Sequence, residues 1–166
     1  MRCFVIMGVA GCGKTTVGEA LAARTGVCFV DGDALHPPGN IEKMSRGVPL
    51  DDADRAPWLS RVGLELAQRE GNVAVGCSAL KRAYRDMIRA RAGEPVCFLH
   101  LYAEQPVIAA RMAKRSGHFM PTSLLDSQFD ALERLQSDET GHAIDIDNSF
   151  EAVVAEAAQW VREAVA

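Results

Sequence analysis

Residues 8–15 have the sequence Gly-Val-Ala-Gly-Cys-Gly-Lys-Thr, which fits G-x-x-x-x-G-K-[ST], the phosphate-binding loop (P-loop) of nucleoside triphosphate enzymes. A short apolar run at 3–7 precedes it and has the character of a buried parallel strand. The residues from 16 to 24 continue as a helix, with apolar side chains at helical spacing. Strand, glycine-rich loop and helix in this order favour a bound triphosphate over an ordinary glycine-rich turn.

The chemistry of the loop follows from its residue types. Its glycines permit backbone conformations and close approaches that side chains would block. Successive N–H groups can then point at phosphate oxygens, at the positive end of the following helix. We expect Lys14 to reach the β- and γ-phosphates and the Thr15 hydroxyl to bind Mg²⁺. The residues expected to hold the nucleotide here are Gly8, Gly11, Cys12, Gly13, Lys14, Thr15 and Thr16.

Length and composition indicate an ordinary soluble globular protein. A chain of 166 residues suits one domain, spanning 1–166. The net charge of −4 argues against a general nucleic-acid binder, and no apolar run approaches the length of a membrane span. Cleavage of a signal peptide would destroy the P-loop, so we expect none.

The five cysteines form no C-x-x-C pair, which predicts reduced thiols in a cytoplasmic protein. Four of them are expected to be buried in or beside strands: Cys3, Cys28, Cys77 and Cys97.

An acidic pair follows the second predicted strand, at 27–30. Asp31 and Asp33 flank a glycine, and strand periodicity puts their carboxylates on the same side. Ligands of open α/β sheets gather at the carboxyl ends of strands, so we expect both residues close to the P-loop. Asp31 would hold magnesium-bound water, and Asp33 would contact an acceptor hydroxyl. The alternatives are a solvated turn or a helix N-cap.

The insert at 34–59 is long and is broken by four prolines. It contains a possible brief helix at 40–46 and many side chains able to hydrogen-bond a polyol. A long loop after such a strand end is more often functional than not. Pro57 is expected to begin the next helix, which would run to Gly71.

Basic residues open the helix predicted at 81–91, after a third strand at 73–77. Ser78, Ala79 and Leu80 are expected to cap it. Lys81 and Arg85 lie in its first turns, at a strand's carboxyl end, where an anionic or hydroxylated substrate would be met. Arg89 and Arg91 are expected to form a solvated helix face.

A second basic pair follows the fourth predicted strand, at 95–101. Arg111 and Arg115 are four apart on a helix that begins at Pro106, and the segment 116–121 follows. Such a region closes over the nucleotide in small phosphotransferases, and arginine can stack on a base or pair with phosphate. The alternative is an exposed helix end.

The rest of the chain completes the alternation. A helix from 122 or 123 has an apolar side that includes Gln128, a fifth strand is expected at 143–147, and Ser149 would cap the last helix. Strands alternate with helices five times, which predicts a three-layer α/β/α fold with a five-stranded parallel sheet.

The residues now quoted resemble the gluconokinase family of small P-loop carbohydrate kinases over nearly the whole chain. Beside the P-loop, the resemblance is carried by 31–37 (DGDALHP), 40–44 (NIEKM), 47–59 (GVPLDDADRAPWL), 77–86 (CSALKRAYRD), 118–121 (HFMP) and 127–133 (SQFDALE). One departure follows residue 133, where family members often carry a proline and this chain has Arg-Leu-Gln.

The resemblance implies ATP-dependent, Mg²⁺-assisted phosphorylation of D-gluconate to 6-phosphogluconate, which enters the pentose phosphate or Entner–Doudoroff routes. It also implies a nucleoside-monophosphate-kinase-like fold, a lid at about 111–122 and often a homodimer. The expected catalytic residues are Lys14, Asp33, Arg111 and Arg115, with Arg111 also on the nucleotide. The expected substrate-binding residues are Asp33, His36, Lys43, Arg55, Lys81, Arg85 and His118.

Two other functions remain open from the residues alone. Another small-acceptor kinase, for shikimate or a nucleotide, would share Lys14 and a lid. A GTP-binding switch is disfavoured because no [NT]-K-x-D element follows a late strand.

Overall fold

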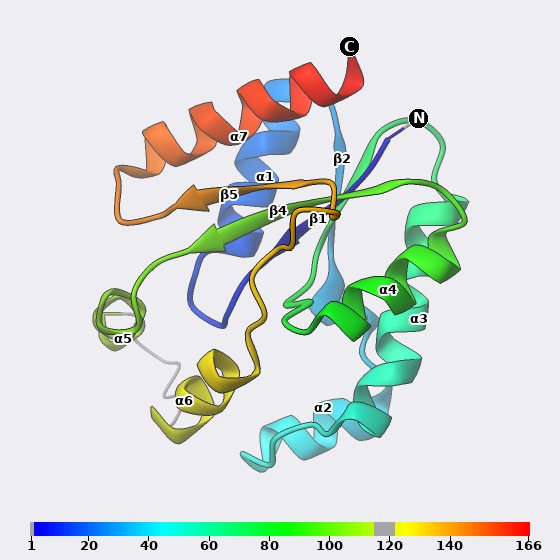
Figure 1. Ribbon diagram of the computed structural model, residues 1–166. Helices are drawn as coiled ribbons and strands as arrows, with labels where there is room; N and C mark the ends of the chain where they lie inside the picture. The colour runs from blue at the N-terminus through cyan, green and yellow to red at the C-terminus, as the bar shows by residue number, and fades with distance from the viewer. Residues whose placement is uncertain (1, 115–121) are drawn as a thin grey trace.

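The computed structural model describes residues 2–114 and 122–166, and the side chains of all of these except 122 and 123. At its centre lies a sheet of five parallel strands in the order β2-β3-β1-β4-β5 (Figure 1). The strands are β1 (Cys3–Met7), β2 (Cys28–Asp31), β3 (Val73–Gly76), β4 (Val96–Tyr102) and β5 (Gly141–Asp145). The apolar run at 3–7 forms the central strand, and all five of its residues are buried. The predicted five-stranded parallel sheet is confirmed.

Helices cover both faces of this sheet (Figure 1). The helical elements are α1 (Lys14–Thr25), the 3₁₀ helix η1 (Gly32–Leu35), α2 (Pro38–Ser45), α3 (Asp52–Gln68), α4 (Arg82–Ala92), α5 (Gln105–Ala113), α6 (Thr122–Ala131) and α7 (Phe150–Val165). Successive side chains of β1 point to opposite faces. Phe4 and Ile6 therefore pack in one core with residues of α1 and α7, while Val5 and Met7 pack in another with residues of α3 and α4. The three-layer α/β/α prediction is confirmed.

The register of the sheet brings the carboxyl ends of its strands to one edge. Ile6 pairs with Gly76, and Met7 pairs with His100. The P-loop follows β1 at this edge, η1 follows β2, and the segment from Cys77 follows β3. Segments far apart in the sequence therefore lie around the P-loop, where ligands of open α/β sheets bind.

The start of α3 differs from the prediction. The helix begins at Asp52, not at Pro57, because Asp51 and Asp54 form a capping box. The Asp51 carboxylate accepts the Asp54 N–H at 2.8 Å, and the Asp54 carboxylate accepts the Asp51 N–H at 3.1 Å. This reciprocal cap begins the helix before Pro57, which is tolerated inside it although it cannot bond the carbonyl of Ala53.

Two further expectations about local structure need correction, and one is confirmed. The cap residue of α4 is Lys81, so the segment 78–80 lies before the helix and does not cap it. Cys28 is exposed because it lies on the edge strand β2, whereas the other strand cysteines are buried. Ser149 caps α7 as predicted, since its side chain accepts the Ala152 N–H.

Candidate active site

The P-loop has the backbone conformation that its glycines predict. Gly8, Gly11 and Gly13 all have positive φ, at 142°, 80° and 93°. A Cβ at Gly8 would lie 2.5 Å from the carbonyl oxygen of Leu101, and one at Gly11 would lie 2.5 Å from Cγ of Met112. Neither position accepts a side chain, so the path of the loop depends on glycine at both.

Lys14 and Thr15 open α1 directly after the loop. Lys14 Nζ donates to the carbonyl oxygens of Gly8 and Val9, each at 3.0 Å. Thr15 Oγ1 donates to Asp31 Oδ2 at 3.1 Å. The first acidic residue after β2 therefore lies beside the P-loop hydroxyl, although the two residues are sixteen positions apart.

The acidic pair is held by η1. Asp31 Oδ1 accepts the Asp33 N–H at 3.0 Å and so caps this short helix. Gly32 is needed between them, because a Cβ there would lie 2.1 Å from the carbonyl oxygen of Gly76. Trp58 of α3 fixes the same turn, since its indole N–H donates to the Gly32 carbonyl at 2.7 Å. Burial raises the pKa of the Asp33 carboxyl; nearby Lys14 opposes this effect and Asp31 adds to it.

Two cavities meet at the P-loop. A smaller one, of about 310 Å³, is lined by loop residues together with Arg111, Ile146, Asn148 and Phe150. A larger one, of about 600 Å³, is lined by Lys14, Thr15, Asp33, His36, Arg55 and others. Both include Gly11, Gly13 and Thr16. The loop thus separates two binding spaces and contributes to each.

His36 lines the larger cavity as a neutral ring. It stacks on Trp58 with ring centroids 4.0 Å apart. Burial, together with nearby Arg55, lowers the pKa of His36 to about 4. Asn40 Nδ2 lies 3.3 Å from His36 Nδ1, and an amide nitrogen can only donate, so Nδ1 accepts. At neutral pH the ring therefore carries its hydrogen on Nε2 and offers a donor.

Arg55 of α3 lines the same cavity and is oriented by the segment before α3 and by α4. Its Nε donates to the Leu50 carbonyl at 3.2 Å, and its guanidinium lies 5.7 Å from the ring centre of Tyr84. The Tyr84 hydroxyl donates to Asp52, which fixes that ring. A planar guanidinium held in this way suits bidentate recognition of a carboxylate.

Arg85 corrects one substrate-binding prediction. Its side chain and that of Glu139 are both fully buried. The guanidinium donates to both carboxylate oxygens of Glu139 at 2.7 Å, and to the carbonyl oxygens of Ala79, Leu80 and Glu133 at 3.1 Å. These partners use the donors of Arg85 away from the cavity. The prediction that it binds substrate is wrong, because the buried face of α4 carries it into the protein.

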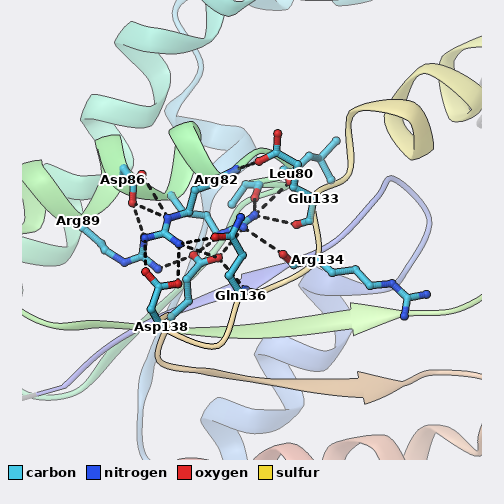
Figure 2. A network of polar contacts seen from close by, with 11 residues as sticks. Leu80, Arg82, Asp86, Arg89, Glu133, Arg134, Gln136 and Asp138 are labelled. Carbon is cyan, nitrogen blue, oxygen red and sulfur yellow. Dashed lines mark hydrogen bonds and ion pairs between the residues drawn. The ribbon is translucent and has the colours of Figure 1, made fainter.

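The surrounding polar network corrects the expected solvated position of Arg89 (Figure 2), whereas Arg91 is exposed as predicted. Arg89 donates to Glu139 at 2.6 Å and lies 4.7 Å from the ring centre of Phe98. Arg82 donates to Asp138 and to Asp86, and Figure 2 shows these three residues together. α4 is therefore tied by its cations to the segment before β5.

Two lysines that were also predicted to bind substrate form ion pairs with aspartates instead. Lys43 Nζ lies 2.7 Å from a carboxylate oxygen of Asp54, and Lys81 Nζ lies 2.9 Å from one of Asp52. Neither lysine lines the larger cavity. The Lys43 pair joins α2 to α3 within the insert. The Lys81 pair joins the start of α4 to α3, and so connects the insert to the rest of the protein.

Arg111 lines the smaller cavity at the end of α5 and donates to the Ile146 carbonyl. Asn148 and Phe150 complete this wall from the segment after β5. Arg115 and His118, with most of the expected lid at 111–122, lie outside the described residues.

Gln128 is a site residue that the sequence prediction missed. Its Oε1 accepts the Ala10 N–H of the P-loop at 2.7 Å, and it lines the larger cavity. The sequence pattern places it on the apolar side of its helix. A lone amide among Leu124, Leu125, Phe129 and Leu132 was the available signal, because a polar residue on an apolar helix face needs a partner.

The central strand of this sheet leads into the P-loop and then into a helix, and cavities adjoin the loop. This arrangement defines a P-loop kinase. A family model described as an AAA domain matches residues 4–135. The chain is 47% identical to the thermosensitive gluconokinase of Escherichia coli, over 95% of this chain and 86% of that protein. It is 51% identical to the gluconokinase of Gluconobacter oxydans, over 83% and 79%. The crystal structure of a gluconokinase from Sinorhizobium meliloti superposes with a TM-score of 0.88 at 48% identity, over 95% and 90%. The chain belongs to the gluconokinase family.

Proposed function

We propose that the protein transfers the γ-phosphoryl group of ATP to a terminal hydroxyl of D-gluconate and forms 6-phospho-D-gluconate. The observation that carries this proposal is the larger cavity, where Lys14 and Asp33 line the same space as Arg55 and His36. A guanidinium suits the carboxylate of a sugar acid, while a carboxylate and an imidazole N–H suit its hydroxyls. The family supports the same acceptor.

The nucleotide would bind on the other side of the loop. Arg111 and Phe150 line the smaller cavity and offer a guanidinium plane and an apolar ring to the base. The N–H groups at the start of α1 would hold the phosphates, with Lys14 on the β- and γ-oxygens. This arrangement aims the terminal phosphate toward the larger cavity.

Magnesium fits the residues beside the loop. A hydroxyl and a carboxylate, the oxygen ligands that Mg²⁺ accepts, lie 3.1 Å apart at Thr15 and Asp31. The described residues contain no group of three acidic, histidine or cysteine side chains for a metal, which suits an ion held mainly through phosphate oxygens and water. When bound, Mg²⁺ would neutralise charge on the phosphates. Thr15 would hold it directly and Asp31 through water.

The remaining residues would align the acceptor. Asp33 would orient the attacking hydroxyl and accept its proton, a role that a raised pKa favours near neutral pH. Arg55 would bind the gluconate carboxylate, and His36 would donate from Nε2. Arg115 and His118 stay predictions for the transferring phosphate and the acceptor. Phosphoryl transfer requires such alignment more than covalent chemistry.

Steady-state kinetics with ATP test the proposal directly. The panel contains D-gluconate, other sugar acids, shikimate and nucleoside monophosphates. We expect turnover with gluconate to exceed that with every other acceptor. Turnover of shikimate or a nucleotide without gluconate would overturn the assignment, and tight GTP binding without any acceptor would favour a switch.

We also propose one kinase domain over 1–166, with an acceptor-selecting insert at 34–59 and a lid at about 111–122. The resemblance supports a homodimer, the cysteine pattern supports a cytoplasmic location, and the net charge of −4 argues against a nucleic-acid partner. No helix within the described ranges has the length and apolar character needed to cross a membrane. Light scattering tests the dimer, and cell fractionation tests the location.

A further inference from the structure

We propose that Gln128 is a positioning residue for phosphoryl transfer, because it holds the first half of the P-loop by a hydrogen bond to Ala10 and lines the larger cavity with it. The inference rests on the proposed function. Gln128 belongs to α6, and its contact with Ala10 joins residues 118 positions apart. The Ala10 N–H can only donate, so the amide oxygen of Gln128 must be the atom that faces it.

The hydrogen bonds of the loop divide its N–H groups into two sets. The Gly8 N–H donates to the Ser78 carbonyl at 3.2 Å, the Ala10 N–H to Gln128 at 2.7 Å, and the Cys12 N–H to the Val9 carbonyl at 3.4 Å. Within the described part of the chain, the N–H groups of five other loop residues have no protein partner. These five are at Val9, Gly11, Gly13, Lys14 and Thr15.

This division fits the task of the loop. Four of these five, within residues 11–15, belong to the stretch whose N–H groups converge on a phosphate at the start of α1. The protein bonds at Gly8 and Ala10 fix the backbone that carries them. Of these two, the bond at Ala10 is the one made by a side chain, so a substitution can remove it without changing the loop sequence.

The position of Gln128 is itself fixed from outside the loop. Just after α6, the Glu133 N–H donates to the Leu80 carbonyl at 2.9 Å, and the Glu133 carboxylate accepts the Arg82 N–H at 2.5 Å. Figure 2 shows these three residues side by side. Arg85 Nη1 donates to both the Leu80 and the Glu133 carbonyls at 3.1 Å. The chain after α6 is thus tied to the start of α4.

These contacts connect the P-loop, the segment before α4 and α6 in a closed series. The segment before α4 accepts the Gly8 N–H through Ser78 and binds Glu133 through Leu80. α6 then returns to the loop through Gln128. α6, the segment before α4 and the P-loop are therefore held in fixed positions relative to one another. Catalytic residues need such support to keep their geometry.

Gln128→Met tests the role, because it removes the acceptor and keeps a side chain of similar length. The bond supports geometry more than ground-state binding, so we expect kcat to fall about ten- to hundredfold. KM for ATP and for gluconate should stay within about threefold. Amide hydrogen exchange at Ala10, followed by NMR, should accelerate at least about tenfold.

Two variants complete the experiment. Gln128→Glu keeps an oxygen for the Ala10 N–H, so protection of that amide should return toward the wild-type level. Asp130→Ala changes an exposed residue of the same helix and should match the wild type in exchange and in kcat. Unchanged kcat in Gln128→Met, or equal losses in Asp130→Ala, would overturn the proposal. A wild-type protein inactive with gluconate would instead count against the proposed function, and the Ala10 exchange rates would still test the contact.

Discussion

Replacing Glu139 with glutamine should destabilise the protein strongly, because it removes the charge that compensates a buried guanidinium. Arg85 and Glu139 are fully buried, and Arg89 also donates to this carboxylate. Burial alone would raise the pKa of Glu139, but hydrogen bonds from Arg85, Arg89 and the Gln136 N–H outweigh it and lower the pKa to about 2. The variant keeps the shape of the side chain and loses its charge.

The expected loss in the free energy of unfolding can be obtained in two ways, and the two values are similar. Breaking a buried ion pair by removing one partner costs about 3–5 kcal/mol. The fall in the Glu139 pKa from 4.5 to about 2 corresponds to about 3 kcal/mol of stabilisation at neutral pH. For a chain of this size, a loss of about 3 kcal/mol lowers Tm by about 6–12 °C.

The pH dependence separates the charge from the packing. Because the folded pKa is lowered, this stabilisation is complete above pH 4.5 and is lost as the pH falls toward 2. Urea unfolding of wild type and Glu139→Gln at pH 7, 5, 4 and 3, followed by circular dichroism, measures it. The difference in the free energy of unfolding should be largest at pH 7 and should shrink below about pH 4.5.

A matched control lies one residue away. Asp138→Asn removes a carboxylate that is 65% exposed and pairs with Arg82, and we expect a loss of no more than about 1 kcal/mol. A Glu139→Gln loss below about 1 kcal/mol at pH 7, or a loss that stays constant down to pH 3, would refute the reasoning.

Three predictions concern turnover. Lys14→Ala should abolish turnover and leave the circular dichroism spectrum unchanged. Near-normal activity of this variant would contradict the proposed kinase function. Asp33→Asn should lower kcat much more than ATP affinity measured by titration. Since burial raises the Asp33 pKa, the acid limb of wild-type kcat/KM should lie above the usual aspartate range and disappear in that variant; a limb that persists would remove Asp33 from the reaction. Arg55→Lys should raise KM for gluconate about tenfold or more, because a bidentate contact becomes a single one, whereas an equal rise in KM for ATP would contradict the carboxylate role.

The P-loop unit and the layer architecture could be predicted because their signals are local. The motif at 8–15 specifies a backbone path that needs glycine, and the apolar run before it marks a strand buried on both faces. Alternation of strands and helices then leaves few parallel topologies. The signal for the start of α3 is also local, but it lies in the Asp51 and Asp54 capping box and not in Pro57.

The partners of α4 could not be predicted, because they lie far away in the sequence. Helical spacing put Lys81, Arg85 and Arg89 together correctly as a set of cations. Arg85 and Arg89 both bond Glu139, which is 54 positions beyond Arg85, whereas Lys81 pairs with Asp52. A helix-opening arginine near a strand end has the same local pattern whether it meets a substrate or a buried carboxylate. Only the tertiary path of the segment 133–139 distinguishes the two.

Asp31 shows that two local interpretations need not exclude each other. The sequence offered a helix cap or a place beside the metal as alternatives. Oδ1 accepts the Asp33 N–H at 3.0 Å, and Oδ2 accepts the Thr15 hydroxyl at 3.1 Å. The cap fixes the carboxylate plane, and the fixed plane keeps the second oxygen beside the P-loop. The structural role of Asp31 is therefore the physical reason that it can serve the site, since a carboxylate without the cap would be free to turn away from Thr15.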